Sequence, residues 1–172
     1  MEYTHIIHPF PALYDEYSRV LILGSLPSVK SREQMFFYGH PQNRFWRVMA
    51  ALLDAPVPAT TEEKSRLILS NRLALWDTIY SCDIIGSSDA SIKNVVPTDL
   101  SSVLAGSRIE HIFCNGKTSW KYFRLHQEKT LGMKAATLPS TSPANAACSL
   151  PKLIQAWGEA LLPCLQDDAR GE

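Results

Sequence analysis

The sequence carries no excess charge of either sign: Lys and Arg together number 17, Asp and Glu together number 17, and the isoelectric point is about 7.0. An overall positive field that would attract nucleic acid is therefore absent, and any such contact needs a local patch. No apolar run approaches the roughly 18 to 20 residues that cross a bilayer. The first residues, MEYTHIIHPFP, contain neither the basic nor the apolar segment of a secretory signal. These absences predict a soluble, cytoplasmic protein.

Cysteine is scarce and widely spaced. The four cysteines are Cys82, Cys114, Cys148 and Cys164, and no CxxC pair occurs. An iron–sulfur cluster or a structural zinc would need ligands from four distant segments, which the usual ligand spacings disfavour. We therefore predict four free thiols in a reducing compartment, no metal and no cofactor.

Glycine-rich phosphate loops and nucleophile elbows are also absent, because neither GxxxxGK[ST] nor GxSxG occurs. A serine hydrolase is disfavoured, since no serine lies in an elbow with a paired histidine and acid. The sequence does contain LILGSLPSVKS at residues 21–31, where an apolar strand stops at Gly24 and a turn-forming run follows. That loop is a candidate for holding a ligand.

Apolar strands alternate with helical segments along the chain. Strand-like runs occur at residues 19–24, 73–76, 110–115 and 135–138, and helical periodicity at 43–54, 62–71 (with Thr60 and Glu63 as a capping box) and 150–165 (with Ser149 as N-cap). Helices between short apolar strands favour a parallel sheet covered on both faces. The sequence predicts a single α/β domain at residues 1–165 and a polar C-terminal tail at residues 166–172.

The loops that follow the predicted strands are candidates for a ligand site, because ligands of such sheets bind outside the carboxyl ends of the strands. These loops are residues 24–28, the residues from Asp77 onward, 115–117 and 139–145, and three of the four are rich in Ser, Thr, Asn, Gly and Pro. Hydroxyl and backbone N–H groups on turns bind phosphate without much positive charge. The same residues are also what ordinary turns are made of, so composition leaves both interpretations open.

Four motifs in order along the chain carry a resemblance to a known family. They are GSLPS at 24–28, GHPQNRFW at 39–46, ALWDTIYSCDIIGSSDASI at 74–92 and LPSTSPAN at 138–145. Together they resemble the uracil-DNA glycosylase superfamily, and within it the hypoxanthine-DNA (deoxyinosine) glycosylase branch. The resemblance spans nearly the whole chain. It implies a three-layer sandwich in which helices flank a central four-stranded, mainly parallel sheet.

The resemblance implies a monofunctional, monomeric enzyme that flips a deaminated base out of DNA and hydrolyses its bond to deoxyribose. Hypoxanthine is the expected base, with uracil and xanthine as alternatives. Related members carry an Asp or Asn where this chain has Leu26, and a His or Asn where it has Leu138. The catalytic role therefore moves to Asn43, which the branch is held to use. Its amide offers a carbonyl acceptor for water and an NH2 donor; as the alternative, Asn43 is only a helix cap.

The remaining predicted site residues divide into two groups. The base pocket is expected to contain Gly24, Ser25, Leu26, Phe37, Tyr38, His40, Asp77 and Asn115. The DNA backbone is expected to contact Ser28, Lys117, Ser140, Thr141 and Ser142. His40 is either a catalytic acid or a loop residue, and His5 and His8 are equally eligible as acids. Ser87, Ser88 and Asp89 belong either to the pocket rim or to a plain turn.

A local positive patch is predicted on one helix. Lys117, Lys121 and Arg124 recur at positions i, i+4 and i+7, so they form one positive stripe. The stripe fits either duplex DNA or a solvated helix face. The competing hypothesis for the whole protein is a non-catalytic nucleotide- or nucleic-acid-binding module on the same fold, for which Leu26 and Leu138 are the strongest argument.

Overall fold

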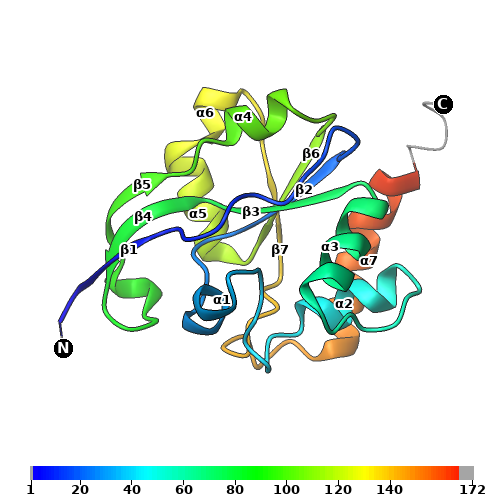
Figure 1. Ribbon diagram of the computed structural model, residues 1–172, viewed down its shortest axis with the longest axis horizontal. Coiled ribbons are helices and arrows are strands. Elements are labelled where there is room, and N and C mark those ends of the chain that lie inside the picture. The colour runs from blue at the N-terminus through cyan, green and yellow to red at the C-terminus, as the bar shows by residue number, and fades with distance from the viewer. Residues whose placement is uncertain (1, 167–172) are drawn as a thin grey trace.

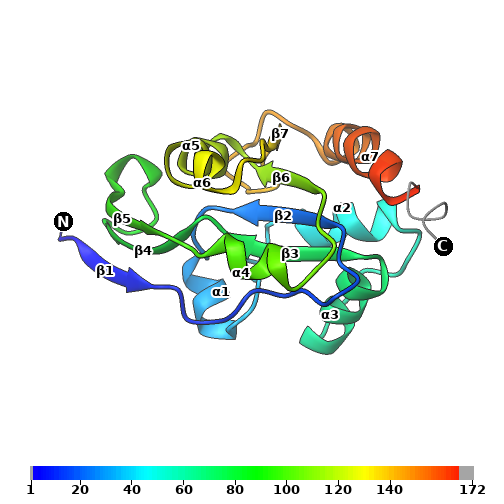
Figure 2. The same cartoon turned by 90° about the horizontal axis from the view of Figure 1, so that it is seen from above.

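The computed structural model describes residues 2–166 (Figures 1 and 2). The strands are β1 (Thr4–Ile7), β2 (Val20–Gly24), β3 (Leu73–Asp77), β4 (Ile79–Ile84), β5 (Lys93–Pro97), β6 (His111–Asn115) and β7 (Ala136–Leu138). The helices are α1 (Val29–Gln34), α2 (Phe45–Leu52), α3 (Thr61–Ser70), α4 (Leu100–Ala105), α5 (Lys117–His126), α6 (Glu128–Leu131) and α7 (Leu150–Gln166), with a 3-10 turn, η1, at Asp89–Ser91.

The central sheet has the order β3-β2-β6-β7, and all of its neighbouring strands are parallel. These are the four strands that the sequence predicts. Strand β2 is buried at all five positions, as expected for a strand covered on both faces. The predicted three-layer α/β architecture is confirmed.

Alternate side chains of β2 enter two different hydrophobic cores. Val20 and Ile22 pack in the core that α2, α3 and α7 complete, whereas Leu21 and Leu23 pack in the core that α4 and α5 complete. Figure 1 shows α2, α3 and α7 grouped on one side of the strands and α5 and α6 on the other. The period of two along a strand therefore generates the three layers.

A second, antiparallel sheet with the order β1-β4-β5 was not predicted. Only Thr78 separates the end of β3 from the start of β4, so a single apolar stretch of sequence serves both sheets. The inner face of this sheet packs Ile79 and Cys82 against Tyr122 of α5. The small sheet thereby fixes α5 beside the carboxyl ends of the central strands.

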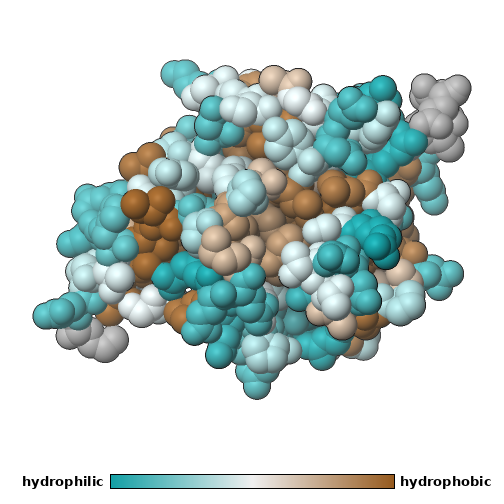
Figure 3. Space-filling view, in the orientation of Figure 1, coloured by the Kyte–Doolittle hydropathy of each residue, from teal (hydrophilic) through white to brown (hydrophobic). Residues whose placement is uncertain are grey.

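Hydrophobic side chains also reach the surface at the small sheet. Ile7, Tyr80 and Val96 are exposed, and Figure 3 shows hydrophobic surface over β4 and β5. Hydrophilic side chains cover the lower rim of the same view, around α1. Within residues 2–166, no helix has both the length and the apolar character that crossing a bilayer requires.

Two predicted helix N-caps are present in the structure, whereas two predicted helix boundaries differ from the observed ones. The Thr60–Glu63 capping box is present, and the hydroxyl of Ser149 accepts a hydrogen bond from the backbone N–H of Lys152 at 3.4 Å. Helix α2 is shorter than predicted and begins at Phe45. Helix α7 includes Gln166, which the sequence assigned to the tail; residues 167–172 of that tail lie outside the described residues.

Candidate active site

The carboxyl ends of the four parallel strands meet at one edge of the sheet. Gly24 of β2 lies opposite Asp77 of β3 in the strand register, and Asn115 of β6 lies opposite Leu138 of β7. The loops that the sequence marked out follow these residues directly. Parallel pairing therefore brings three of the resembling motifs to one place.

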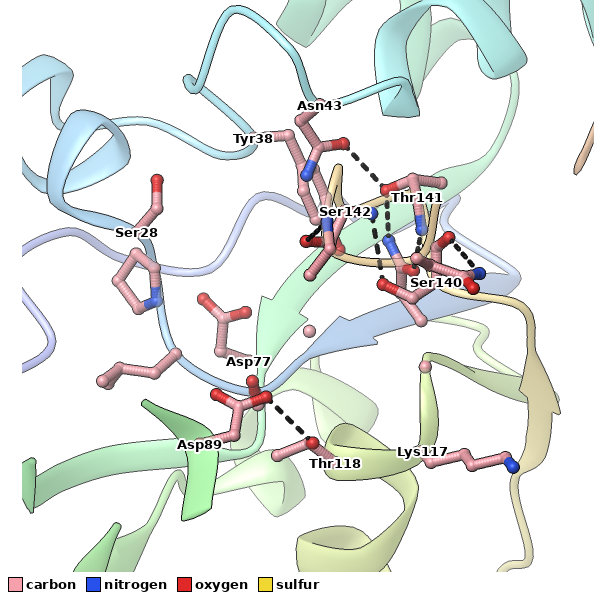
Figure 4. Close-up of a pocket in the computed structure, with 18 of the residues that line it drawn as sticks. Ser28, Tyr38, Asn43, Asp77, Asp89, Lys117, Thr118, Ser140, Thr141 and Ser142 are labelled. Carbon is pink, nitrogen blue, oxygen red and sulfur yellow. Dashed lines mark hydrogen bonds between the residues drawn. The ribbon is translucent and has the colours of Figure 1, made fainter. Parts of the chain in front are cut away.

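A cavity of about 870 Å³ opens at this edge (Figure 4). Its lining comes from residues 24–28, Phe37, Tyr38, Asn43, Asp77, Gly86, Ser87, Asp89, 115–118 and 137–142, with further contributions from α1 and α7. Its size is typical of small-molecule sites. Ser25 and Leu26, which the sequence assigned to the base pocket, lie in this lining.

The floor of the cavity carries a buried carboxylate. Asp77 is 4% exposed, and its Oδ2 lies 2.7 Å from Nε2 of His8, whose side chain is fully buried. A Cβ atom on Gly24 would lie 2.4 Å from Oδ1 of Asp77, so position 24 must be glycine for Asp77 to keep its place. The carboxylate is therefore held on one side by a histidine and bordered on the other by bare backbone.

His8 is a site residue that the sequence offered only as an alternative to His40. Its ring packs against Phe10 and Trp76, with ring centroids 4.6 Å and 4.4 Å away. When Asp77 is ionised, Nε2 must carry the hydrogen and donate it to the carboxylate. Nδ1 is buried and finds no hydrogen-bond partner among the described residues. His8 thus fixes one oxygen of Asp77 and leaves the other for the cavity.

Tyr38 places a hydroxyl beside this carboxylate. Its backbone φ is 52°, an uncommon conformation for a bulky residue, and its ring stacks on Phe45 at a centroid distance of 4.0 Å. Burial, and secondly the charge of Asp77, raise the pKa of Tyr38 far above its ordinary value. The hydroxyl therefore stays protonated and can only be a neutral donor or acceptor.

Asn43 presents its amide to the cavity in a single orientation. Oδ1 accepts hydrogen bonds from the backbone N–H of Phe45 at 2.9 Å and from the hydroxyl of Thr141 at 2.8 Å. Because the backbone N–H of Phe45 can only donate, the amide must present its oxygen there and cannot be flipped. Figure 4 shows the nitrogen on the side away from Thr141. The carbonyl that the sequence expected to hold water is therefore occupied, and the NH2 group is what remains for a ligand.

Thr141 is a positioning residue and does not fit the predicted contact with phosphate. It is fully buried, its backbone N–H donates to Oδ1 of Asn115 at 3.0 Å, and its hydroxyl accepts from Nδ2 of Asn115 at 3.0 Å. The amide of Asn115 is thus used to hold Thr141, which in turn orients Asn43. These hydrogen bonds join three segments that are distant in sequence, those of Asn43, Asn115 and Thr141.

The predicted serines line the cavity, and their oxygens already cap local backbone. Ser28 is the N-cap of α1 and accepts from the N–H of Ser31 at 3.2 Å. Ser140 accepts from the N–H of Ser142, and Ser142 accepts from the N–H of Ala144, each at 3.1 Å. Accepting these bonds leaves the O–H hydrogens of Ser140 and Ser142 able to donate.

Positive charge reaches the cavity from three separate elements. Lys117, which the sequence assigned to a contact with the DNA backbone, lines the cavity from α5, and Arg32 of α1 and Lys152 of α7 line it as well. The latter two were missed because a search for charges at helical spacing cannot detect residues brought together by the fold. Asp89 is bonded to the hydroxyl of Thr118 at 3.0 Å, which fastens the 86–89 turn to the cavity rim.

The structure places two of the predicted base-pocket residues, His40 and Phe37, differently from the prediction. His40 is absent from the cavity lining, and its Nδ1 accepts from the backbone N–H of Gln42 at 3.1 Å. It is a loop residue, because the turn at Pro41 directs its ring to local backbone. Phe37 is 3% exposed and packs edge-on against Phe10, so most of its ring belongs to the core.

The described residues hold no group of three or more His, Cys, Asp or Glu side chains that could bind a metal ion. What the site offers is an amide NH2, a carboxylate and a phenol around one cavity with cations at its mouth. This set can bind a planar polar ligand and polarise it.

Comparisons with known proteins agree with the motifs. The model of the family described as the uracil DNA glycosylase superfamily matches residues 11–161. A protein of Methanosarcina acetivorans named hypoxanthine DNA glycosylase is 34% identical over 138 residues, which is 79% of this chain and 86% of that one. A protein of the same name from Methanosarcina barkeri is 29% identical over 153 residues, covering 88% of this chain and 95% of that one.

A solved structure is similar as well. The solution NMR structure of a candidate uracil DNA glycosylase from Methanosarcina acetivorans matches with a TM-score of 0.73 and 30% identity. The match covers 87% of this chain and 95% of that chain.

Proposed function

Because the chain belongs to the uracil DNA glycosylase superfamily, we propose that it is a DNA glycosylase that removes hypoxanthine from DNA. The names of the two curated relatives support this substrate. In the proposed reaction water attacks C1′ of deoxyribose and the bond from C1′ to the base breaks. The bonding electrons leave with the base, which takes up the proton that water loses. The products are a free base and an abasic site, the starting point of base excision repair.

The observation that carries the proposal is a donor and an acceptor in one cavity. The NH2 of Asn43 and the carboxylate of Asp77 both line it, and Figure 4 shows them on facing sides. Hypoxanthine presents an oxygen, O6, next to an N–H, N1, so the amide would donate to the first and the carboxylate accept from the second. Adenine presents the reverse pattern, because its N6 donates and its N1 accepts. With adenine, the NH2 of Asn43 would face another donor, N6, and the carboxylate of Asp77 would face another acceptor, N1.

The donor of Asn43 and the acceptor of Asp77 match the hydrogen-bonding edge that deamination creates on a base. Replacing an exocyclic amine by oxygen converts an acceptor ring nitrogen into an N–H, in adenine and in cytosine alike. Uracil therefore offers the same edge as hypoxanthine, and guanine offers it with an added amino group. The preference among these bases depends on cavity shape, so a substrate panel must contain all of them.

The NH2 of Asn43 would also serve the chemistry. As the glycosidic bond breaks, negative charge develops on the base and reaches O6. A preorganised donor aimed at that atom stabilises the transition state more than the ground state. An amide is not an effective base at neutral pH, so its proposed role is stabilisation of the leaving base. The hypoxanthine anion is itself a tolerable leaving group.

Excision from an inosine-containing duplex tests the function directly. The purified protein is expected to convert the inosine strand into an alkali-labile product under single-turnover conditions, with slower or no conversion of adenine and guanine strands. Uracil and xanthine strands complete the panel. If the protein binds these duplexes and leaves every one intact, the non-catalytic binding module becomes the better description.

The cations and hydroxyls around the mouth supply the proposed grip on DNA. Lys117, Lys121 and Arg124 are all exposed on α5, and Lys117 also lines the cavity. The stripe thus begins at the cavity mouth and runs along the helix. Ser140 and Ser142, whose hydroxyls can still donate, are proposed to contact phosphates beside it. The phosphate contact expected of Ser28 is not proposed for its hydroxyl, which already donates to Oγ of Ser31 at 3.1 Å.

Replacing Lys117, Lys121 and Arg124 together by glutamine is expected to weaken duplex binding and flatten its dependence on salt. Each lost phosphate contact removes about 0.9 from the slope of log affinity against log salt concentration, so the slope should fall by up to roughly 3. Fluorescence anisotropy over a salt series measures it. The matched control replaces Arg47, Lys64 and Arg66 on α2 and α3 by glutamine. Equal slopes for the two variants would show that the stripe on α5 is only a solvent-exposed helix face and does not bind DNA.

A further inference from the structure

The side chain of Arg44 is hydrogen-bonded to the segment from Pro139 to Ser149, the 139–149 loop. Its Nη2 donates to the carbonyl oxygens of Ser142 at 2.9 Å and Asn145 at 3.0 Å. Its Nη1 donates to the carbonyl oxygen of Cys148. One planar guanidinium thereby ties together three points of a loop that contains no helix or strand.

The partners of this cation are unusual. Arg44 is partly buried, and its Nε is enclosed without a hydrogen-bond partner in the described part of the chain. None of the ion pairs found among residues 2–166 includes it. A cation balanced only by carbonyl dipoles costs more desolvation than a surface arginine, and helix α2 does not need it, because its side chain makes no capping bond.

The same backbone segment also carries Asn43. The N–H of Arg44 donates to the carbonyl oxygen of Thr141 at 3.1 Å, and Oδ1 of Asn43 accepts from the hydroxyl of Thr141 at 2.8 Å. Two consecutive residues therefore grip the loop at its start, its middle and its end. The orientation of the Asn43 amide and the shape of the loop are fixed by the same set of bonds.

We propose that Arg44 is a positioning residue that makes the 139–149 loop and the Asn43 amide one preformed unit, so that the loop reaches DNA in the shape that aims the amide at the base. The proposal rests on the glycosylase function proposed above. Lysine cannot replace Arg44, because one ammonium group cannot span carbonyls that a planar fork reaches together.

The test compares Arg44→Lys and Arg44→Ala with the wild type on inosine duplex at saturating enzyme. Both variants are expected to slow single-turnover excision by about 10- to 100-fold, the loss that follows from displacing a reacting group by about 1 Å. Added guanidinium ion at tens of millimolar should restore part of the rate of Arg44→Ala, with sodium at equal ionic strength as the salt control. Arg47 is an exposed arginine three residues away. The Arg47→Ala variant should excise at the wild-type rate, and added guanidinium should not change that rate.

Hydrogen exchange gives a readout that needs no substrate. The amides of Asn145 and Cys148, which donate within the loop, should exchange faster in both Arg44 variants than in Arg47→Ala. Folded Arg44 variants that excise within threefold of wild type, or show unchanged exchange in the loop, would overturn the proposal. A wild-type protein that excises nothing would instead overturn the proposed function, while the exchange comparison would still decide whether Arg44 orders the loop.

Discussion

Replacing Asn43 by alanine is expected to slow single-turnover excision of hypoxanthine by about 10²- to 10³-fold, the loss seen when one preorganised donor is removed from a site. The NH2 of this amide is directed to the cavity, while its oxygen is occupied by Phe45 and Thr141. Affinity for DNA should change far less, because the charges at the cavity mouth are untouched. Rates at saturating enzyme and binding by anisotropy measure the two effects separately.

Asn43→Asp separates the two groups of the amide. A carboxylate still accepts hydrogen bonds from Phe45 and Thr141, so the local structure is retained, but it offers no donor and repels a departing anion. The aspartate variant should therefore be as slow as the alanine variant. Near wild-type excision by Asn43→Asp would show that an acceptor at this position suffices, and the donor role would be abandoned.

A helix cap is the simple alternative for Asn43, and its cost is known. Losing a cap lowers the free energy of unfolding by about 1 kcal/mol without changing the rate of the folded enzyme. Thr60→Ala is the matched control, because the hydroxyl of Thr60 is the N-cap of α3 and accepts from the backbone N–H of Glu63 at 3.1 Å. An Asn43→Ala protein that melts early and excises normally would behave like this control.

Removal of the Asp77 carboxylate has the second largest expected effect. Asp77→Ala should slow excision of hypoxanthine by about 10- to 100-fold, because a hydrogen bond to a charged group contributes about 1.5 to 3 kcal/mol. It should also lower the free energy of unfolding by about 1 to 3 kcal/mol, because Nε2 of His8 is then buried without a partner. Single-turnover kinetics and denaturant unfolding measure the two losses.

The double variant His8→Leu/Asp77→Ala distinguishes function from packing. Removing both partners of a buried hydrogen bond is far less destabilising than removing one, so stability should largely return. The excision rate should stay low, because the acceptor for the base is still missing. A double variant that regains both stability and rate would make Asp77 a purely structural residue.

The central sheet was predictable because each of its strands is apolar and each is separated from the next by a helical or looping segment. The small sheet was not, because β4 follows β3 after one residue and β1 has only one buried position, Ile6. Neither shows a clear period of two that would mark a half-buried strand.

Within the candidate site, the sequence pointed to Asp77 because it ends a predicted strand, and to Asn43 only through the motif that carries the family resemblance. It did not locate the partners that define their roles. His8 is 69 positions from Asp77, and Thr141 is 98 positions from Asn43. Which group of the Asn43 amide is free depends on that distant hydroxyl, and no local periodicity or composition encodes such a contact.

Those two hydrogen bonds also determine when during folding the site comes into existence. Contacts between residues so far apart require most of the chain to be ordered first, because closing long loops is entropically unfavourable until other contacts support it. Pairing of β2 with β6 joins residues equally far apart, such as Val20 and His111, so a chain in which only the helices have formed contains Asp77 and Asn43 without yet containing a base pocket. Recovery of excision during refolding should accordingly lag behind recovery of secondary structure, so that catalysis reports the completion of the fold and not its onset.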